Sequence, residues 1–259
     1  MFFWRRVLDP GPGAHGVHMA FTSRLGGSSP PPWDSLNLGG RTGDAPKAVE
    51  ANRAAVASAF DLPRHRLLFL NQCHGNTVAV AEAPWNGDAP SADAVVTSRN
   101  DLAVAALAAD CVPVLLADPR AGVVAAVHAG RPGMIAGVVG AAIDVMTAQG
   151  AAVHDIVAVV GPSVCGRCYE VPEEMREAAA AVSRVSATVS WIGTPAIDVG
   201  AGVVDQLRQR GVSITWVPGC TREDGNLFSH RRDGRTGRFA GVIRLAPPGG
   251  AYASAGASP

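Results

Sequence analysis

The chain has 259 residues, of which 47% are hydrophobic and 17% are charged, so a folded core is expected and high-charge disorder is excluded for most of it. Lysine plus arginine and aspartate plus glutamate balance at 22 each, which leaves no net charge to attract a nucleic acid or an anionic membrane. No window offers the roughly 20 clean apolar residues of a membrane span, and the N-terminus does not resemble a secretory signal. We expect a cytoplasmic monomer with neither nucleic acid nor membrane as a partner.

Helical and strand-like segments alternate through the first half of the chain. Residues 26–46 are dense in glycine, proline and serine and predict a loop or flap. Apolar residues at helical spacing predict a helix over 47–60. Residues 113–116 and the turn at 118–120 are interpreted as a hairpin connection. The strands expected in this half are 67–70, 78–80, 102–109 and 122–127.

The second half continues the alternation. Helices are expected over 132–148, 172–182 and 199–209, the last capped by Asp198. Strands are expected over 156–160, 212–217 and 239–245. Residues 246–259 are mostly alanine, glycine, proline and serine and predict a disordered C-terminal tail. Because no repeat or linker divides the remainder, one α/β catalytic domain over 1–245 is expected.

Three side chains that are far apart in the sequence follow predicted strands. His74, Cys111 and His128 each lie at or just past a strand end, so one sheet edge would bring them together. A catalytic zinc takes three nitrogen, sulfur or oxygen ligands and keeps one position open, which this set fits. Two histidines and a cysteine are also the ligands of blue copper sites, and Cys111 with His128 alone would form a thiolate and its base. A buried thiol and two loop histidines remain the structural alternative.

Other cysteines and histidines carry weaker signals. A multicopper oxidase would need more histidines than the seven present, several of which lie in loops. The pair Cys165 and Cys168 is a lone CxxC without the second pair of a zinc ribbon, so a metal or redox role is disfavoured. Cys73 and Cys220 are interpreted as structural thiols or bystanders.

Two arginine-containing segments are the best candidates for an oxyanion site. Residues 231–238 contain four arginines, and Arg24 precedes two glycines. Guanidinium groups bind phosphate through two hydrogen bonds, and glycine-rich backbone adds N–H donors. A solvated charged surface is the alternative.

Several short motifs follow one another in order. They are Asn71-Gln72-Cys73-His74-Gly75, Asp93-Ala94-Val95-Val96-Thr97, Ala109-Asp110-Cys111-Val112-Pro113-Val114, Val127-His128-Ala129-Gly130, Tyr169-Glu170-Val171, Cys220-Thr221, Phe228-Ser229-His230-Arg231-Arg232 and Thr236-Gly237-Arg238. Over about residues 19 to 245 this succession resembles the YfiH family, also called the laccase-domain or polyphenol oxidoreductase family. The chain departs from it at Arg131-Pro132-Gly133, where the family has Trp-Arg-Gly, and at Cys73, where valine is more common.

The resemblance implies a fold and a function. The fold would be a single-domain layered α/β sandwich of mixed β-sheet with flanking helices. Zn²⁺ would be bound by His74, Cys111 and His128, with copper as the less favoured metal. Family members are described as purine nucleoside phosphorylases that cleave adenosine, inosine and methylthioadenosine with phosphate and also deaminate adenosine. Older descriptions call them laccases, and bacterial relatives are linked to peptidoglycan editing.

The leading hypothesis is therefore zinc-dependent chemistry on a purine nucleoside. We expect Arg24, Arg232 and Arg238 to bind phosphate, and Asp110 or Gln72 to orient the base or a water. Asp110 is alternatively the partner that fixes a ligand histidine. The other hypotheses are a Cys111/His128 hydrolase acting on amide bonds of cell-wall precursors, a copper-dependent polyphenol oxidoreductase, and a non-enzymatic binding domain with a structural metal.

Overall fold

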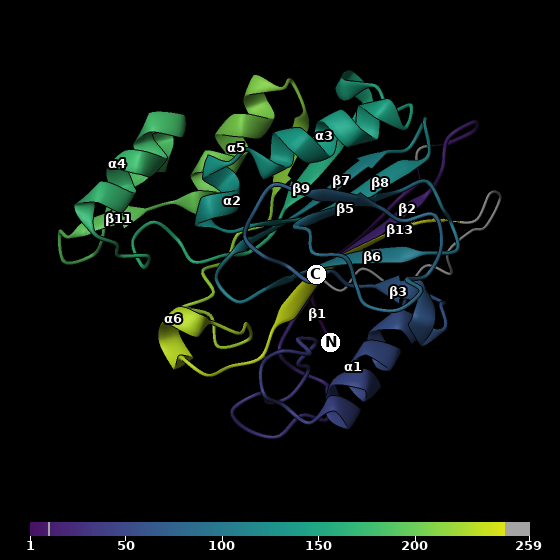
Figure 1. Cartoon of the computed structure of the whole chain (residues 1–259), viewed down its shortest axis with the longest axis horizontal. Helices are drawn as coiled ribbons and strands as arrows, with labels where there is room; N and C mark the ends of the chain where they lie inside the picture. The colour runs from purple at the N-terminus through teal and green to yellow at the C-terminus, as the bar shows by residue number, and fades with distance from the viewer. Residues whose placement is uncertain (10, 247–259) are drawn as a thin grey trace.

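Two mixed β-sheets stack face to face in the computed structural model, which describes residues 1–9 and 11–246 (Figure 1). The five-stranded sheet has the order β1 (Phe2–Leu8), β2 (Val17–Thr22), β13 (Phe239–Leu245), β6 (Ala103–Ala108) and β3 (Leu67–Leu68). The six-stranded sheet has the order β12 (Ser213–Trp216), β9 (Val157–Val160), β7 (Val112–Asp118), β8 (Val123–Ala129), β5 (Ala94–Thr97) and β4 (Val78–Val80). Each sheet mixes parallel and antiparallel pairs.

Helices cover the outer faces of both sheets (Figure 1). The five-stranded sheet carries α1 (Pro46–Ser58), and the six-stranded sheet carries α2 (Arg131–Ile135), α3 (Val138–Ala148) and α5 (Val199–Gln209). Farther out lie α4 (Glu173–Val182) and the hairpin of β10 (Ala187–Val189) and β11 (Pro195–Ile197), and the short α6 (His230–Asp233) precedes β13. Single 3₁₀ turns occupy Arg64–Arg66, Val153–Asp155 and Arg184–Ser186. Within the described ranges, no helix is long and apolar enough to cross a membrane.

Alternating side chains along the strands build the three largest of the four hydrophobic cores among the described residues. In β8, Val123, Ala125 and Val127 pack toward the helices, whereas Val124 and Ala126 pack toward the other sheet. The same alternation in β2 and β6 divides their side chains between the inter-sheet core and the core against α1. Because of this period of two, His128 lies on the face of β8 that looks toward the five-stranded sheet.

The structure confirms the layered α/β sandwich and most predicted elements, including Asp198 as the N-cap of α5, whose carboxylate accepts from Ala201 N–H. The interpretation of 113–116 as a connection was wrong: these residues belong to β7, a wholly buried strand between β8 and β9. The predicted helix over 132–148 is two helices, because Gly137 adopts φ 77° between them.

Besides β7, strands β1, β2, β5, β10 and β11 are additions to the predicted set. Of the predicted tail, only Ala246 is described, and 247–259 lie outside the described residues. The single domain over 1–245 stays a prediction.

Candidate functional site

Two chain connections that cross between the sheets bring distant residues together. His74 lies between β3 of the five-stranded sheet and β4 of the six-stranded sheet. Cys111 lies between β6 and β7, which also belong to different sheets, and His128 is within β8. The expectation that one sheet edge would present all three was therefore wrong, because the site forms where the two sheets meet.

The donor atoms of His74, Cys111 and His128 lie within 4.8 Å of one another. Cys111 Sγ is 3.8 Å from His74 Nε2, and the two imidazole rings meet edge to face with centroids 4.8 Å apart. Gly130 leaves room for this arrangement, since a Cβ there would lie 2.7 Å from the His74 ring. Together with Asp93, described next, these residues form what we call the ligand corner.

Asp93 organises the ligand corner, although it entered the sequence analysis only as part of a motif. Its buried carboxylate accepts hydrogen bonds from the backbone N–H groups of His74 (2.9 Å) and Gly75 (2.6 Å) and from His128 Nδ1 (2.8 Å). These bonds hold His74 at φ 64°, a left-handed conformation that is costly for a residue with a side chain. Because Nδ1 of His128 binds Asp93, Nε2 is the nitrogen left for a ligand.

The electrostatics of the ligand corner favour a thiolate. Burial would raise the pKa of Asp93, but hydrogen bonds from His128, Cys73 and backbone N–H groups hold it well below its usual range. Burial also opposes ionisation of Cys111, yet the charge of His128 and hydrogen bonds from both histidines lower its pKa to about 6. Burial disfavours the His128 imidazolium, but Cys111 and Asp93 raise its pKa to about 9. The pair is therefore poised as thiolate and imidazolium.

Asp110 organises a second structure beside the ligand corner, which we call the Asp110 wall: Asp110, Thr221, Ser229 and Arg231. The Asp110 carboxylate accepts hydrogen bonds from the hydroxyls of Thr221 and Ser229 and from the backbone N–H of Arg231, each at 2.6 Å. Asp110 itself adopts φ 97°. The residue that fixes ligand His128 is Asp93, so the alternative role considered for Asp110 belongs to Asp93.

Gln72 joins the connection between β3 and β4 to strand β6. Its amide Nε2 donates to the carbonyl of Leu107 at 2.9 Å, and its Oε1 accepts from the Leu107 N–H at 2.8 Å. The side chain therefore extends the pairing of the five-stranded sheet beside the site. Both Gln72 and Asp110 line the cavity described next.

A cavity of about 980 Å³ opens from the ligand corner, a volume suited to a small organic ligand. Besides His74, Cys111 and His128, its cationic and aromatic lining consists of Arg41, Arg53, Phe69, Arg131, Tyr169, His230, Arg231 and Arg238. The Arg231 guanidinium lies 5.0 Å from the centre of the Tyr169 ring. Burial lowers the pKa of Arg238, while the nearby charges of Cys111 and Asp110 oppose that shift. Five arginines therefore face one cavity that ends in three side chains able to hold a metal ion.

The three arginines expected at phosphate do not share one place. Arg238 lines the cavity. Arg24 instead binds the carbonyl and carboxylate of Asp34 and lies over Phe228. Arg232 donates to the carbonyls of Thr221, Asp224 and Leu227 and to the carboxylate of Asp233, so it orders its own loop. Neither lies in the cavity lining.

The ligand corner fits a divalent metal such as zinc. It offers one thiol whose pKa is lowered and two imidazoles, a donor set that zinc accepts in catalytic sites. Asp93 supplies the carboxylate–histidine contact that orients zinc-ligating histidines. A multicopper centre fits less well, because neither metal-competent cluster in the described part of the chain contains more than two histidines.

The sequence matches known proteins over most of its length. Residues 18–246 match the family described as multi-copper polyphenol oxidoreductase laccase. The chain is 55% identical over 233 residues to a purine nucleoside phosphorylase of Streptomyces griseus, which covers 88% of this chain and 94% of the relative. It is 49% identical over 228 residues to one of Mycobacterium tuberculosis, with 88% and 91% covered.

Solved structures share the fold. The YfiH protein of Bacillus licheniformis superimposes with a TM-score of 0.83 at 27% identity, covering 92% of this chain and 98% of that one. The YlmD protein of Geobacillus stearothermophilus gives a TM-score of 0.84 at 29% identity, with 93% and 94% covered. The matches extend across both sheets and therefore across the whole site.

Proposed function

The chain belongs to the YfiH family, the multi-copper polyphenol oxidoreductase laccase group, and from this membership we propose that it is a zinc-dependent purine nucleoside phosphorylase. Its substrates would be phosphate and the nucleosides adenosine, inosine and methylthioadenosine, with adenosine deamination as a second activity. The observation that carries the proposal is the cavity, which joins a two-histidine, one-cysteine corner to several arginines. The names of the relatives in Streptomyces and Mycobacterium support the reaction class.

The arginines of the cavity account for the phosphate substrate. Arg238 lines the cavity, and the charges of both Cys111 and Asp110 act on its pKa. A planar guanidinium there would bind phosphate through two hydrogen bonds and hold it for attack on C1′ of the ribose. Arg131 and Arg231 line the same cavity and would add positive charge. Arg24 and Arg232, with their donors occupied elsewhere, gain no support from their placement.

The remaining residues would orient the nucleoside. Tyr169 offers an aromatic surface in the cavity, and Arg231 lies against its ring. A bound Zn²⁺, held by His74, Cys111 and His128, would supply Lewis acidity at the closed end of the site. Gln72 and Asp110 would act as positioning residues, because their hydrogen bonds hold the two walls of the cavity in place.

The direct test is a product analysis. Zinc-loaded protein is incubated with adenosine, with and without phosphate, and the products are separated by chromatography. We expect adenine and ribose 1-phosphate only when phosphate is present, and inosine in both cases. His74→Ala should abolish all three products, because it removes a metal ligand. Absence of every product from protein with zinc bound would contradict the proposal.

We also place the enzyme in the cytoplasm as a monomer. The five cysteines are all free, as expected in a reducing compartment. Sedimentation of the full chain tests the monomer, and fractionation of the source cells tests the compartment.

A second candidate function has one observation in its favour. The lowered pKa of Cys111, the raised pKa of His128 and the bond from His128 to Asp93 resemble the thiolate, base and orienting acid of a cysteine hydrolase. Such an enzyme would cleave amide bonds, for instance in cell-wall precursors. It predicts activity that survives chelation and is lost on alkylation, the reverse of what a metal-dependent phosphorylase requires.

A further inference from the structure

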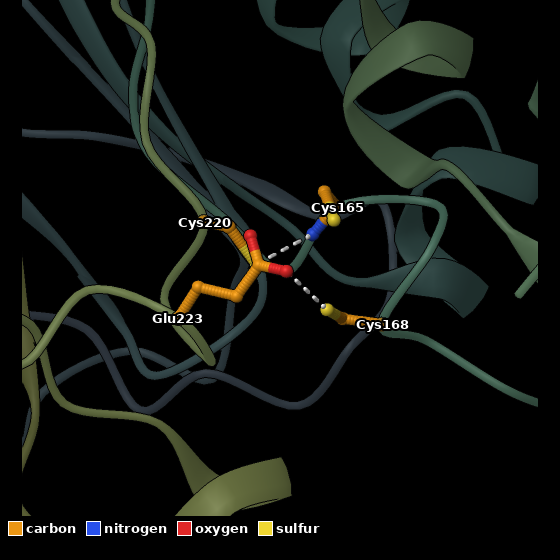
Figure 2. A group of neighbouring side chains, drawn as sticks. All are labelled: Cys165, Cys168, Cys220 and Glu223. Atoms are coloured by element: carbon orange, nitrogen blue, oxygen red, sulfur yellow. Dashed lines mark hydrogen bonds between the residues drawn. The ribbon is translucent and has the colours of Figure 1, made fainter. Parts of the chain in front are cut away.

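A second cluster of metal-binding side chains lies outside the cavity. Cys165, Cys168, Cys220 and Glu223 place one donor atom each within 4.8 Å of the others. Figure 2 shows the four side chains converging from two segments, with Cys168 Sγ donating to Glu223 Oε1 at 3.4 Å and Cys165 N–H donating to Cys220 Sγ at 3.4 Å. None of the four lines the cavity of the proposed reaction.

The isolated CxxC lacked a second pair of ligands, and the fold places such a pair beside it. Cys165 and Cys168 are separated by two residues, and so are Cys220 and Glu223. The fold brings these two pairs together through a parallel bridge between Ser163 and Cys220. Two pairs with two-residue gaps, held on neighbouring segments, resemble the arrangement of a structural zinc site, with a glutamate in place of the fourth cysteine. A search for paired cysteines in the sequence misses the second pair, because its last residue is a glutamate.

We propose that Cys165, Cys168, Cys220 and Glu223 bind one structural Zn²⁺, distinct from the metal of the ligand corner and independent of the proposed reaction. With Zn–S bonds of about 2.3 Å, tetrahedral ligand atoms lie about 3.8 Å apart. The donor atoms here need only a small contraction to reach that geometry. Three sulfurs and one carboxylate oxygen complete four-coordination, so the site is closed, as structural zinc sites are.

The position of the cluster indicates which parts of the fold a bound ion would hold together. The Cys165 segment continues from β9 and carries Tyr169, and the Cys220 segment carries Thr221 of the Asp110 wall. Val164 N–H also donates to the carbonyl of Asp110 at 3.0 Å. A metal that joins these two segments would hold one wall of the cavity against another. Trp191, at the tip of the β10–β11 hairpin, donates to Glu223 and extends the same network.

Metal counting on the full chain tests the proposal. After dialysis against zinc, elemental analysis should find about two ions per chain in the native protein and about one in either Cys165→Ala/Cys168→Ala or His74→Ala. Cobalt substitution identifies which site remains, since the sulfur-to-cobalt charge-transfer band grows with the number of bound thiolates. His74→Ala should keep the strong three-thiolate band, whereas the double cysteine variant should show the weak band of Cys111 alone.

The fourth ligand is tested by Glu223→Gln, with Glu177→Gln, an exposed glutamate on α4, as the matched control. Glu223→Gln should weaken zinc binding at this site by at least about 10-fold in competition with a chelating dye, whereas Glu177→Gln should not change it. Should the double cysteine variant fail to fold, cobalt titration of the native chain still gives two phases of unequal intensity. A single zinc that only His74→Ala removes would overturn the proposal.

Discussion

The ligand corner and the Asp110 wall are each organised by one aspartate, but the two carboxylates hold different kinds of partner. Asp93 lies next to a buried strand and accepts from His128 and from the backbone beside His74. Asp110 lies in a crossing connection and accepts from Thr221, Ser229 and the backbone of Arg231. The first carboxylate fixes metal-binding atoms, whereas the second fixes the loop that carries cavity arginines.

This difference separates two properties of one site. Metal affinity should depend on the ligand corner, because only there does a hydrogen bond orient a donor imidazole. The shape of the substrate cavity should depend on the Asp110 wall, because its hydrogen bonds hold Arg231 and the segment before β13. Variants of the two aspartates should therefore fail in different ways.

The largest effect is expected for Asp93→Ala. Removal of this carboxylate leaves buried N–H groups and His128 without their acceptor, which should lower the free energy of unfolding by about 3–5 kcal/mol. Zinc affinity should fall by about 10- to 100-fold. Urea denaturation and chelator competition measure the two quantities. A variant that retains native zinc affinity would show that Asp93 does not orient His128.

The next largest effect is expected for Arg238, which lines the cavity. Arg238→Ala should raise the KM for phosphate by about 10-fold or more, since a charged hydrogen-bond pair contributes about 1.5–3 kcal/mol. Zinc content should stay unchanged. Arg232→Ala is the control: it should lower the melting temperature because Arg232 binds three backbone carbonyls, yet leave the KM for phosphate within about twofold. Equal phosphate KM values for the two variants would remove Arg238 from the substrate site.

A smaller effect is expected for Asp110→Asn. The amide keeps one oxygen for the hydroxyls of Thr221 and Ser229, but an NH₂ group then faces the N–H of Arg231. Loss of that one bond should cost about 1–2 kcal/mol of stability and raise substrate KM, with zinc affinity unchanged. Zinc titration measures the affinity for the metal, and steady-state kinetics on the same variant measure the substrate KM. Loss of zinc in this variant would show that zinc binding depends on the Asp110 wall as well as on the ligand corner.

Some features of these two regions could be predicted from the sequence, and others could not. The proximity of His74, Cys111 and His128 was predictable because each lies at or just past a predicted strand end and because the motifs that contain them resemble one family. The role of Asp93 was not predictable, since an aspartate before a short strand is usually a turn residue, and its partner His128 is 35 residues away. Likewise β7 resembled a connection because Pro113 and the turn after it are typical of loops, whereas burial on both faces made it a central strand.

Arginines were predictable as a group but not one by one. The sequence placed Arg24, Arg232 and Arg238 in charged segments. All three guanidinium groups donate to backbone carbonyls in the fold, but of the three only Arg238 also lines the cavity. Arg53 and Arg41 come from the region of the predicted flap and α1, which no local pattern connects to the metal-binding residues. Arg41 and Arg53 reach the cavity because of how the two sheets and α1 pack together, which the sequence around each arginine does not show.

The smallest predicted effect compares a thiol of the ligand corner with one near the Asp110 wall. In metal-free protein, Cys111 should react with iodoacetamide along a titration curve with a midpoint near its pKa of about 6. Above this pH the thiolate is present and alkylation is fast, and below it the thiol is protonated and slow. Cys168, with a pKa of about 12, should remain unreactive through neutral pH. Peptide mass spectrometry assigns each adduct to a cysteine. The Cys111→Ser variant identifies the part of the total alkylation that is due to Cys111. Added zinc should protect Cys111 from the reagent. A Cys111 midpoint near the ordinary value of 9.0 would mean that His128 does not stabilise the thiolate.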